Sequence, residues 1–139
     1  MKILLATDGS SASTRALRFL IRHQVRSEGA RLTLIHVDAP LNGHVASYLD
    51  EPAIHGYHAR NAAAAMRHAR RILASESIDH EELLTTGDAA EEIAIAARRG
   101  KFDMVAMGSH GRGAVGSAFL GSVVRKVLER SKVPILVVR

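Results

Sequence analysis

The sequence predicts an α/β fold: an open, doubly wound sheet of five parallel strands with helices on both faces. Short runs rich in Ile, Leu and Val alternate along the chain with segments of helical periodicity. Several of the runs are apolar on both faces, as in a parallel sheet that helices cover on both sides. The length of 139 residues suits one domain, so we expect residues 1–139 to form a single unit.

The expected strands are the apolar runs. They are Lys2–Ala6, Arg31–Val37, Glu81–Thr85, Phe102–Met107 and Val133–Val138. Pro134 lacks an N–H, which favours an edge position for the last strand.

The expected helices lie between the strands. Asp88 and Glu91 have the spacing of a capping box, and Gly100 follows the end of that helix. The segment Asp38–His58 contains two prolines and two glycines and is predicted to be irregular. The helices are Ser13–Arg26, Ala59–Ala74, Asp88–Arg99 and about Ser117–Arg130, the last with Leu120, Val123, Val124, Val127 and Leu128 buried.

Composition excludes several classes of function. The absence of cysteine rules out disulfides, thiolate metal sites and cysteine nucleophiles. The net charge of +5 invites an anionic partner, but aromatic residues make up only 4% and no nucleic-acid-binding motif accompanies the arginine-rich helix faces. We therefore expect no specific nucleic-acid binding. The apolar runs are too short for an export signal or a membrane span, so a cytoplasmic protein is expected.

The most informative motif is a glycine-rich stretch between the fourth strand and the last helix. Gly108, Gly111 and Gly121-Ser122 give backbone that can turn sharply and approach a ligand, followed by a helix N-terminus that suits phosphate. His110 lies inside this stretch, and Arg112 would add a cation near the outer phosphates.

Better-known glycine motifs do not fit this stretch. The letters from Gly111 to Gly116 spell GxGxxG, but they follow the fourth strand rather than the first, and the next strand offers no acidic residue. The chain has neither GxxxxGK[ST] nor a GxSxG nucleophile elbow, and Ser109 and His110 are adjacent, which is poor spacing for a catalytic pair.

With these residues in order, the chain resembles the universal stress protein (UspA-type) family over nearly its whole length. The nucleotide-binding branch of that family carries G-x2-G-x9-G-[ST], which Gly108, Gly111, Gly121 and Ser122 match. The opening residues 3–10, the strand end 34–37, the segment 87–93 and the ending 131–138 also fit. The resemblance implies a Rossmann-like, adenine-nucleotide alpha hydrolase-like sheet with strand order 3-2-1-4-5.

The resemblance also implies an ATP site, with ADP or AMP as alternatives. Ala6, Thr7 and Asp8 would lie against the adenosine, with Asp8 near the ribose. Val37 would meet adenine through its backbone. The remaining site residues carried over are Met107 and Gly108 near base and ribose, and Gly111, Gly121, Ser122 and Val123 at the phosphates. Mg²⁺ or Mn²⁺ on the phosphates is compatible with the resemblance, although no dedicated carboxylate cluster is evident.

Other readings of single residues are weaker. Asp8 lacks the companion acids and the lysine of a phosphoacceptor site, and its simplest structural role is to cap the next helix. His55 and His58 share a predicted loop with two acids, but loop histidines are usually solvated, so no metal site is predicted. His36 is expected to be a packed or edge residue of its strand.

The sequence therefore favours an ATP-binding stress or signalling protein in which nucleotide is a regulatory ligand. No catalytic residue stands out. The alternatives are a slow ATPase or nucleotidyl-transferring enzyme, and a nucleotide-free interaction module. A homodimer through Val133–Val138 is expected, because an apolar edge strand leaves backbone groups that a second copy can pair.

Overall fold

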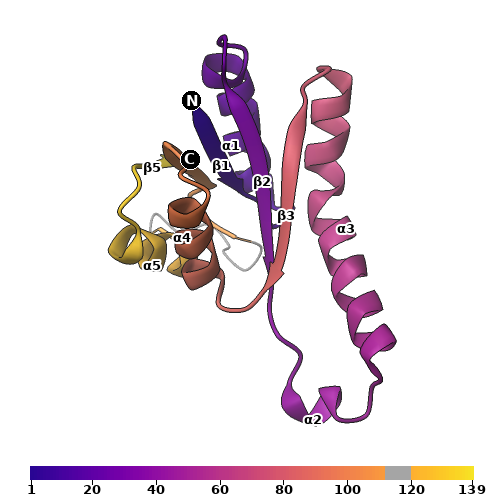
Figure 1. Cartoon of the computed structure of the whole chain (residues 1–139). Coiled ribbons are helices and arrows are strands. Elements are labelled where there is room, and N and C mark those ends of the chain that lie inside the picture. The colour runs from indigo at the N-terminus through magenta and orange to yellow at the C-terminus, as the bar shows by residue number, and fades with distance from the viewer. Residues whose placement is uncertain (112–119) are drawn as a thin grey trace.

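The computed structural model describes residues 1–111 and 120–139. Its five strands form one parallel sheet in the order β3-β2-β1-β4-β5, which confirms the expected fold class (Figure 1). The strands are β1 (Lys2–Ala6), β2 (Arg31–Asp38), β3 (His80–Thr86), β4 (Met104–Gly108) and β5 (Ile135–Val138). Sequence analysis placed β1 correctly, but β4 and β5 begin two residues later than expected, and β2, β3 and β4 each extend one residue further at the carboxyl end.

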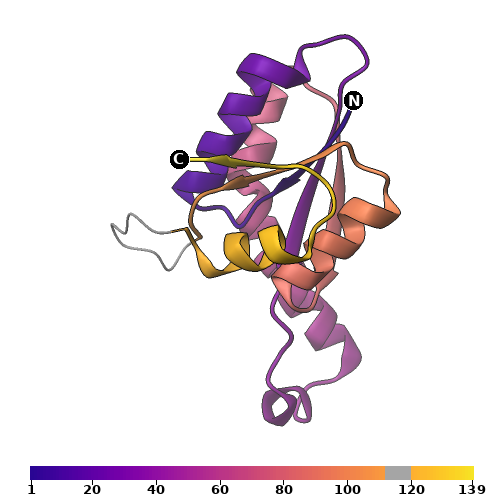
Figure 2. The same ribbon diagram turned by 90° about the vertical axis from the view of Figure 1, so that its left-hand side faces the viewer.

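Helices cover both faces of the sheet (Figures 1 and 2). On one face, α1 (Ser11–Leu20) and α3 (Glu51–Ser75) bury Leu17 and Met66 against Leu5 and Leu34. On the other face, α4 (Ala89–Arg99) and α5 (Ser122–Arg130) bury a second apolar cluster. That cluster contains Leu4, Ile35, Ile93, Val105, Val124 and Val127.

Two expected helices differ from the structure. The first one begins at Ser11, because Ser10 caps it, and its last turn, η1 (Ile21–Val25), is π-helical. The last one begins at Ser122, directly after Gly121, whereas the expected start at Ser117 lies outside the described residues. Val124 and Val127 are buried as expected, but Val123 and Leu128 are 37% and 45% exposed.

The prediction of an irregular Asp38–His58 was wrong. A short helix, α2 (Gly43–Ala46), lies within it, and α3 begins at Glu51 rather than Ala59. The Asp50 side chain caps α3 by accepting a hydrogen bond from Ala53 N at 2.9 Å, and a proline in the first helical turn needs no N–H partner. The N-terminal part of α3 therefore continues beyond the sheet together with α2 (Figure 1).

Within residues 1–111 and 120–139, no helix is both long and apolar enough to cross a lipid bilayer.

Candidate functional site

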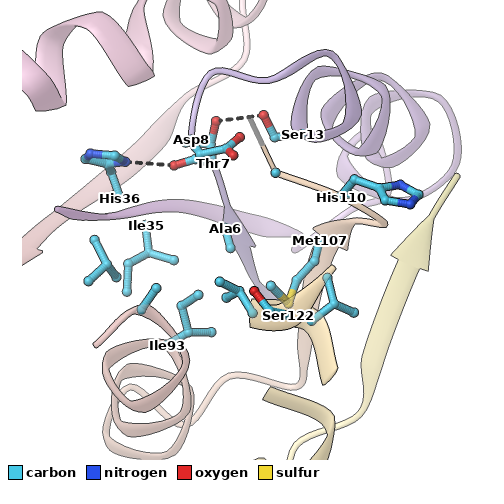
Figure 3. Close-up of a pocket in the computed structure, with 16 residues that line it drawn as sticks. Ala6, Thr7, Asp8, Ser13, Ile35, His36, Ile93, Met107, His110 and Ser122 are labelled. Atoms are coloured by element: carbon cyan, nitrogen blue, oxygen red, sulfur yellow. Dashed lines mark hydrogen bonds between the residues drawn. The ribbon is translucent and has the colours of Figure 1, made fainter. Parts of the chain in front are cut away.

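A cavity of about 490 Å³ opens at the carboxyl ends of β1, β2 and β4 (Figure 3). The sheet order reverses at β1, whose neighbours β2 and β4 connect in opposite directions along the sheet. Parallel sheets of this type bind ligands at such a crevice. Helices α4 and α5 close one side of the cavity, and the N-terminus of α1 closes the other.

Most of the residues predicted from sequence to hold a ligand come together here. Those that line the cavity are Ala6, Thr7, Asp8, Val37, Met107, Gly108, His110, Gly111, Ser122 and Val123. Gly121 lies just behind this wall, where its N–H donates to Ser109 O at 2.8 Å. Arg112 lies outside the described residues.

Asp8 is held by the turn after β1 rather than by capping α1. Its Oδ1 accepts a hydrogen bond from Ser10 N at 2.9 Å, and Ser10 Oγ then accepts from Ser13 N at 3.1 Å. The expectation that Asp8 caps the helix was therefore wrong, because Ser10 does so. A Cβ added at Gly111 would stand 3.0 Å from Asp8 Oδ2, so the carboxylate lies directly against the glycine stretch.

The glycines of the motif differ in whether the surrounding structure leaves room for a side chain. A Cβ at Gly108 would stand only 2.4 Å from the Ala12 carbonyl carbon, so glycine there lets α1 approach β4. A Cβ at Gly121 would meet Ser109 O and the Cα of His110 at an ordinary 3.4 Å. Packing therefore demands Gly108, while Gly121 is not required by contacts within the described residues.

The N-terminus of α5 faces the cavity. Ser122 is its first residue, and Gly121 has no side chain to cap it. The first N–H groups of a helix lack partners within the helix and carry the positive end of its dipole. This end of the cavity is therefore suited to an anionic group.

The opposite part of the cavity is apolar. Ile35, Val37 and Ile93 provide aliphatic side chains from β2 and α4. Figure 3 shows Ile35 and Ile93 facing this space, across from Asp8 and Ser13. A flat apolar group and an anionic group thus find separate environments within one cavity.

Sequence reasoning missed several lining residues. They are Ser13, Ile35, His36, Ala89, Ile93 and Val124. Most are apolar or small, and their patterns indicate burial without indicating a ligand. They lie near the carboxyl end of β2 or in the first turns of α1, α4 and α5. This position, where parallel sheets bind ligands, is the signal from which they could have been predicted.

His36 is the most informative of these residues. It is 8% exposed, and its Nδ1 donates to the Thr7 carbonyl at 2.9 Å, beside Asp8 (Figure 3). The expectation of a packed histidine was right, but the alternative of an edge position was not, because β2 lies between β1 and β3. His36 therefore fixes the end of β1 from the neighbouring strand.

Ser109 and His110 form a hydrogen bond despite being adjacent. Ser109 Oγ and His110 Nδ1 are 2.8 Å apart. Ser109 is only 1% exposed and does not line the cavity, so its hydroxyl does not face a ligand there. The imidazole of His110 points away from Thr7 and Asp8 (Figure 3).

His55 and His58 lie on α3 instead of in a loop. His58 Nδ1 and the Oδ2 of Asp38 are 2.7 Å apart, which ties α3 to the end of β2. Over the ranges 1–111 and 120–139, no three or more histidine, aspartate and glutamate side chains are grouped so as to hold a metal ion.

Comparison with known proteins decides the family. The model of the universal stress protein family matches residues 1–139. The chain belongs to the universal stress protein family. A universal stress protein of Thermus aquaticus is 38% identical over 138 residues, covering 99% of this chain and 97% of the relative.

Solved universal stress protein structures share the fold. UspA of Lactobacillus plantarum superposes with a TM-score of 0.78 at 22% identity, covering 100% of this chain and 97% of that one. The Archaeoglobus fulgidus protein in complex with dAMP gives a TM-score of 0.71 at 21% identity, covering 100% and 98%. At these sequence identities the structural similarity shows a shared fold.

Proposed function

We propose that this universal stress protein binds an adenine nucleotide in the cavity at the carboxyl ends of β1, β2 and β4. The observation that carries the proposal is the uncapped N-terminus of α5, which faces an apolar space in the same cavity. A nucleotide has the matching chemistry, with phosphates at one end and a flat base at the other. The Archaeoglobus fulgidus relative, which binds dAMP, supports this assignment.

Each end of the cavity has a role in this proposal. Adenine lies among Ile35, Val37 and Ile93, and the Asp8 carboxylate accepts a hydrogen bond from the ribose. The phosphates lie at the first N–H groups of α5 and at the Ser122 hydroxyl. Arg112 would add a cation to the outer phosphates.

We further propose that ATP is the nucleotide, that a divalent cation accompanies its phosphates, and that the ligand regulates a cytoplasmic stress response. The slow ATPase remains the alternative to a purely regulatory site. The assay is phosphate release, since turnover well above about 1 s⁻¹ would indicate an enzyme.

The experiment compares two glycine variants in titrations with labelled ATP, each with and without Mg²⁺. Gly121→Val places two methyl groups beside the first turn of α5, where the phosphates would lie, so we expect Kd to rise about 100-fold or more. Gly43→Val is the control, because a Cβ at Gly43 has no atom within 4 Å. Absence of saturable binding by the wild-type protein, or equal binding by the two variants, would refute the proposal.

We also propose that residues 1–139 act as one domain that dimerises through β5. This strand lies at the edge of the sheet, and all four of its apolar side chains are only half-buried. Edge strands of this kind present unpaired backbone groups to a second copy.

A further inference from the structure

A second groove lies at the opposite end of the molecule, between the end of the first helix and the C-terminal end of α3. It has a volume of about 440 Å³. We call it the arginine groove, and its walls include Arg18, Ile21, Arg22, Arg26, Ile72 and Glu76. The nucleotide cavity lies at the carboxyl ends of the strands, whereas α1 runs back along the sheet, so η1 reaches their amino ends (Figure 1). The two sites are therefore separate.

The first helix is unusual in its charge. Between Ser11 and Arg26 it carries four arginines and no acidic residue. Arg18, Arg22 and Arg26 are spaced four residues apart, a spacing at which like charges repel and destabilise a helix by a few tenths of a kcal/mol per pair. The helix dipole favours cations in the last turn, which accounts for part of this arrangement but not for a third arginine a turn earlier.

The π-helical turn brings the three arginines into line. Residues four apart overshoot one turn of an α-helix by about 40°. A π-helical turn takes in about one residue more, so the same step from Arg22 to Arg26 falls short of a turn and reverses the drift. Short π-helical segments occur often at functional sites. Here the segment contains neither proline nor glycine, and Arg18, Arg22 and Arg26 all line one groove.

One carboxylate already occupies this groove. Glu76 pairs with Arg26, and both side chains remain well exposed, at 42% and 62%. Among the residues that the structure describes, Arg18 and Arg22 form no ion pair. Between them, Ile21 is buried and Ile72 half-buried in the floor of the groove.

We propose that the arginine groove docks an acidic segment of a partner protein. Two carboxylates of the segment pair with Arg18 and Arg22, as Glu76 does with Arg26, and an apolar side chain between them covers Ile21 and Ile72. A carboxylate ligand is the choice because Glu76 shows that an arginine of this groove pairs with a carboxylate. The groove therefore recognises two carboxylates of the segment and the apolar side chain that lies between them.

The test measures the fluorescence anisotropy of a labelled peptide of Glu-Leu-Glu repeats at near-physiological salt. Arg18→Glu/Arg22→Glu is expected to raise Kd about tenfold or more, because it removes two charged hydrogen bonds and adds repulsion. Arg67→Glu/Arg71→Glu is the matched control, since both residues are exposed on α3, have the same spacing and give the same change in net charge. We expect the control variant to change Kd less than about twofold. A peptide with Ser in place of Leu is expected to bind the wild-type protein more weakly.

The peptide experiment has clear contrary outcomes. Equal weakening in the two charge-reversed proteins would show a general charge effect and overturn the proposal. So would absence of peptide binding, or tighter binding of a labelled single-stranded oligonucleotide at the same salt concentration. Arg18→Ala/Arg22→Ala, checked for an unchanged thermal unfolding midpoint, repeats the test without charge reversal.

Discussion

At the scale of single residues, one short motif both packs a helix and lines the cavity. Gly108 belongs to the glycine motif, yet its space is filled by the backbone of α1, with Ala12 O 2.6 Å from the position of a Cβ. Gly111 instead leaves room for the Asp8 carboxylate. Gly121 is the residue directly before α5. A motif that is read as a ligand loop therefore also holds a helix against the sheet.

This gives a prediction for Gly108→Ala. The added Cβ would collide with main-chain atoms of Ala12 and Ser13, which cannot rotate away, so we expect the free energy of unfolding to fall by about 1–3 kcal/mol or more. Urea denaturation measures it, with Gly43→Ala as the control in open space. An unchanged unfolding midpoint for Gly108→Ala would contradict this account.

At the scale of elements, α3 is joined to the sheet by two polar contacts as well as by its apolar face. Asp38 at the end of β2 accepts hydrogen bonds from His58 and Asn61 of α3 at 2.7 and 2.8 Å. Burial alone would raise the pKa of Asp38, but these hydrogen bonds outweigh it and the pKa lies below its ordinary value. On β3, hydrogen bonds from Arg70 hold the pKa of the Glu82 carboxyl below its ordinary range.

Lowered carboxyl pKa values make stability depend on pH in a definite direction. Because the folded-state pKa of Glu82 is depressed, its contribution is present above the ordinary pKa of 4.5 and is lost as the pH falls through the folded-state value. We expect Glu82→Gln to lower stability by about 1 kcal/mol or less at pH 7 and to approach the wild type at low pH. Thermal unfolding between pH 7 and pH 3 measures this, with the exposed Glu28→Gln as control. A constant difference across that range would rule out the ion pair as its source.

At the scale of the whole molecule, the sheet has two unlike edges. β3 bears glutamates and is tied to α3 through Glu82, whereas β5 is apolar along its whole length. Pro134 O, just before β5, accepts a hydrogen bond from Val105 N of β4, and Val138 O accepts one from Ser109 N, just after β4. By alternation, the backbone groups of Ile135 and Val137 therefore point away from the sheet. In the proposed dimer, this outer edge of β5 pairs with a second copy of the chain.

The dimer can be tested at one backbone N–H. Val137→Pro removes an outward N–H that pairing with a second copy would use, whereas Val137→Ala keeps that N–H and removes only side-chain bulk. We expect sedimentation velocity to show a dimer for the wild type and for the alanine variant, and a monomer for the proline variant. A wild-type protein that stays monomeric at all concentrations would refute the dimer.

Much of the fold followed from local patterns, whereas most of the candidate site residues were carried over from the family resemblance. Strand β1 lies where its short apolar run places it, and helix α4 begins directly after the Asp88 cap and ends at Arg99 as expected, since these signals act over a few residues. The glycine spacing likewise pointed to the segment that borders the cavity. By contrast, the start of α3 was missed, because prolines and glycines predicted a loop, whereas the Asp50 cap and a proline in the first turn are compatible with a helix start at Glu51.

The sequence alone determined the α/β class, the strand candidates and the chemical character of the glycine stretch, because each depends on residues close together in the chain. Only the tertiary structure decided that His36 of β2 holds Thr7 of β1, that α1 fills the space at Gly108, and that the arginines of the first helix share a groove with α3. These contacts join residues distant in sequence, and burial and packing density, which no local pattern records, select them.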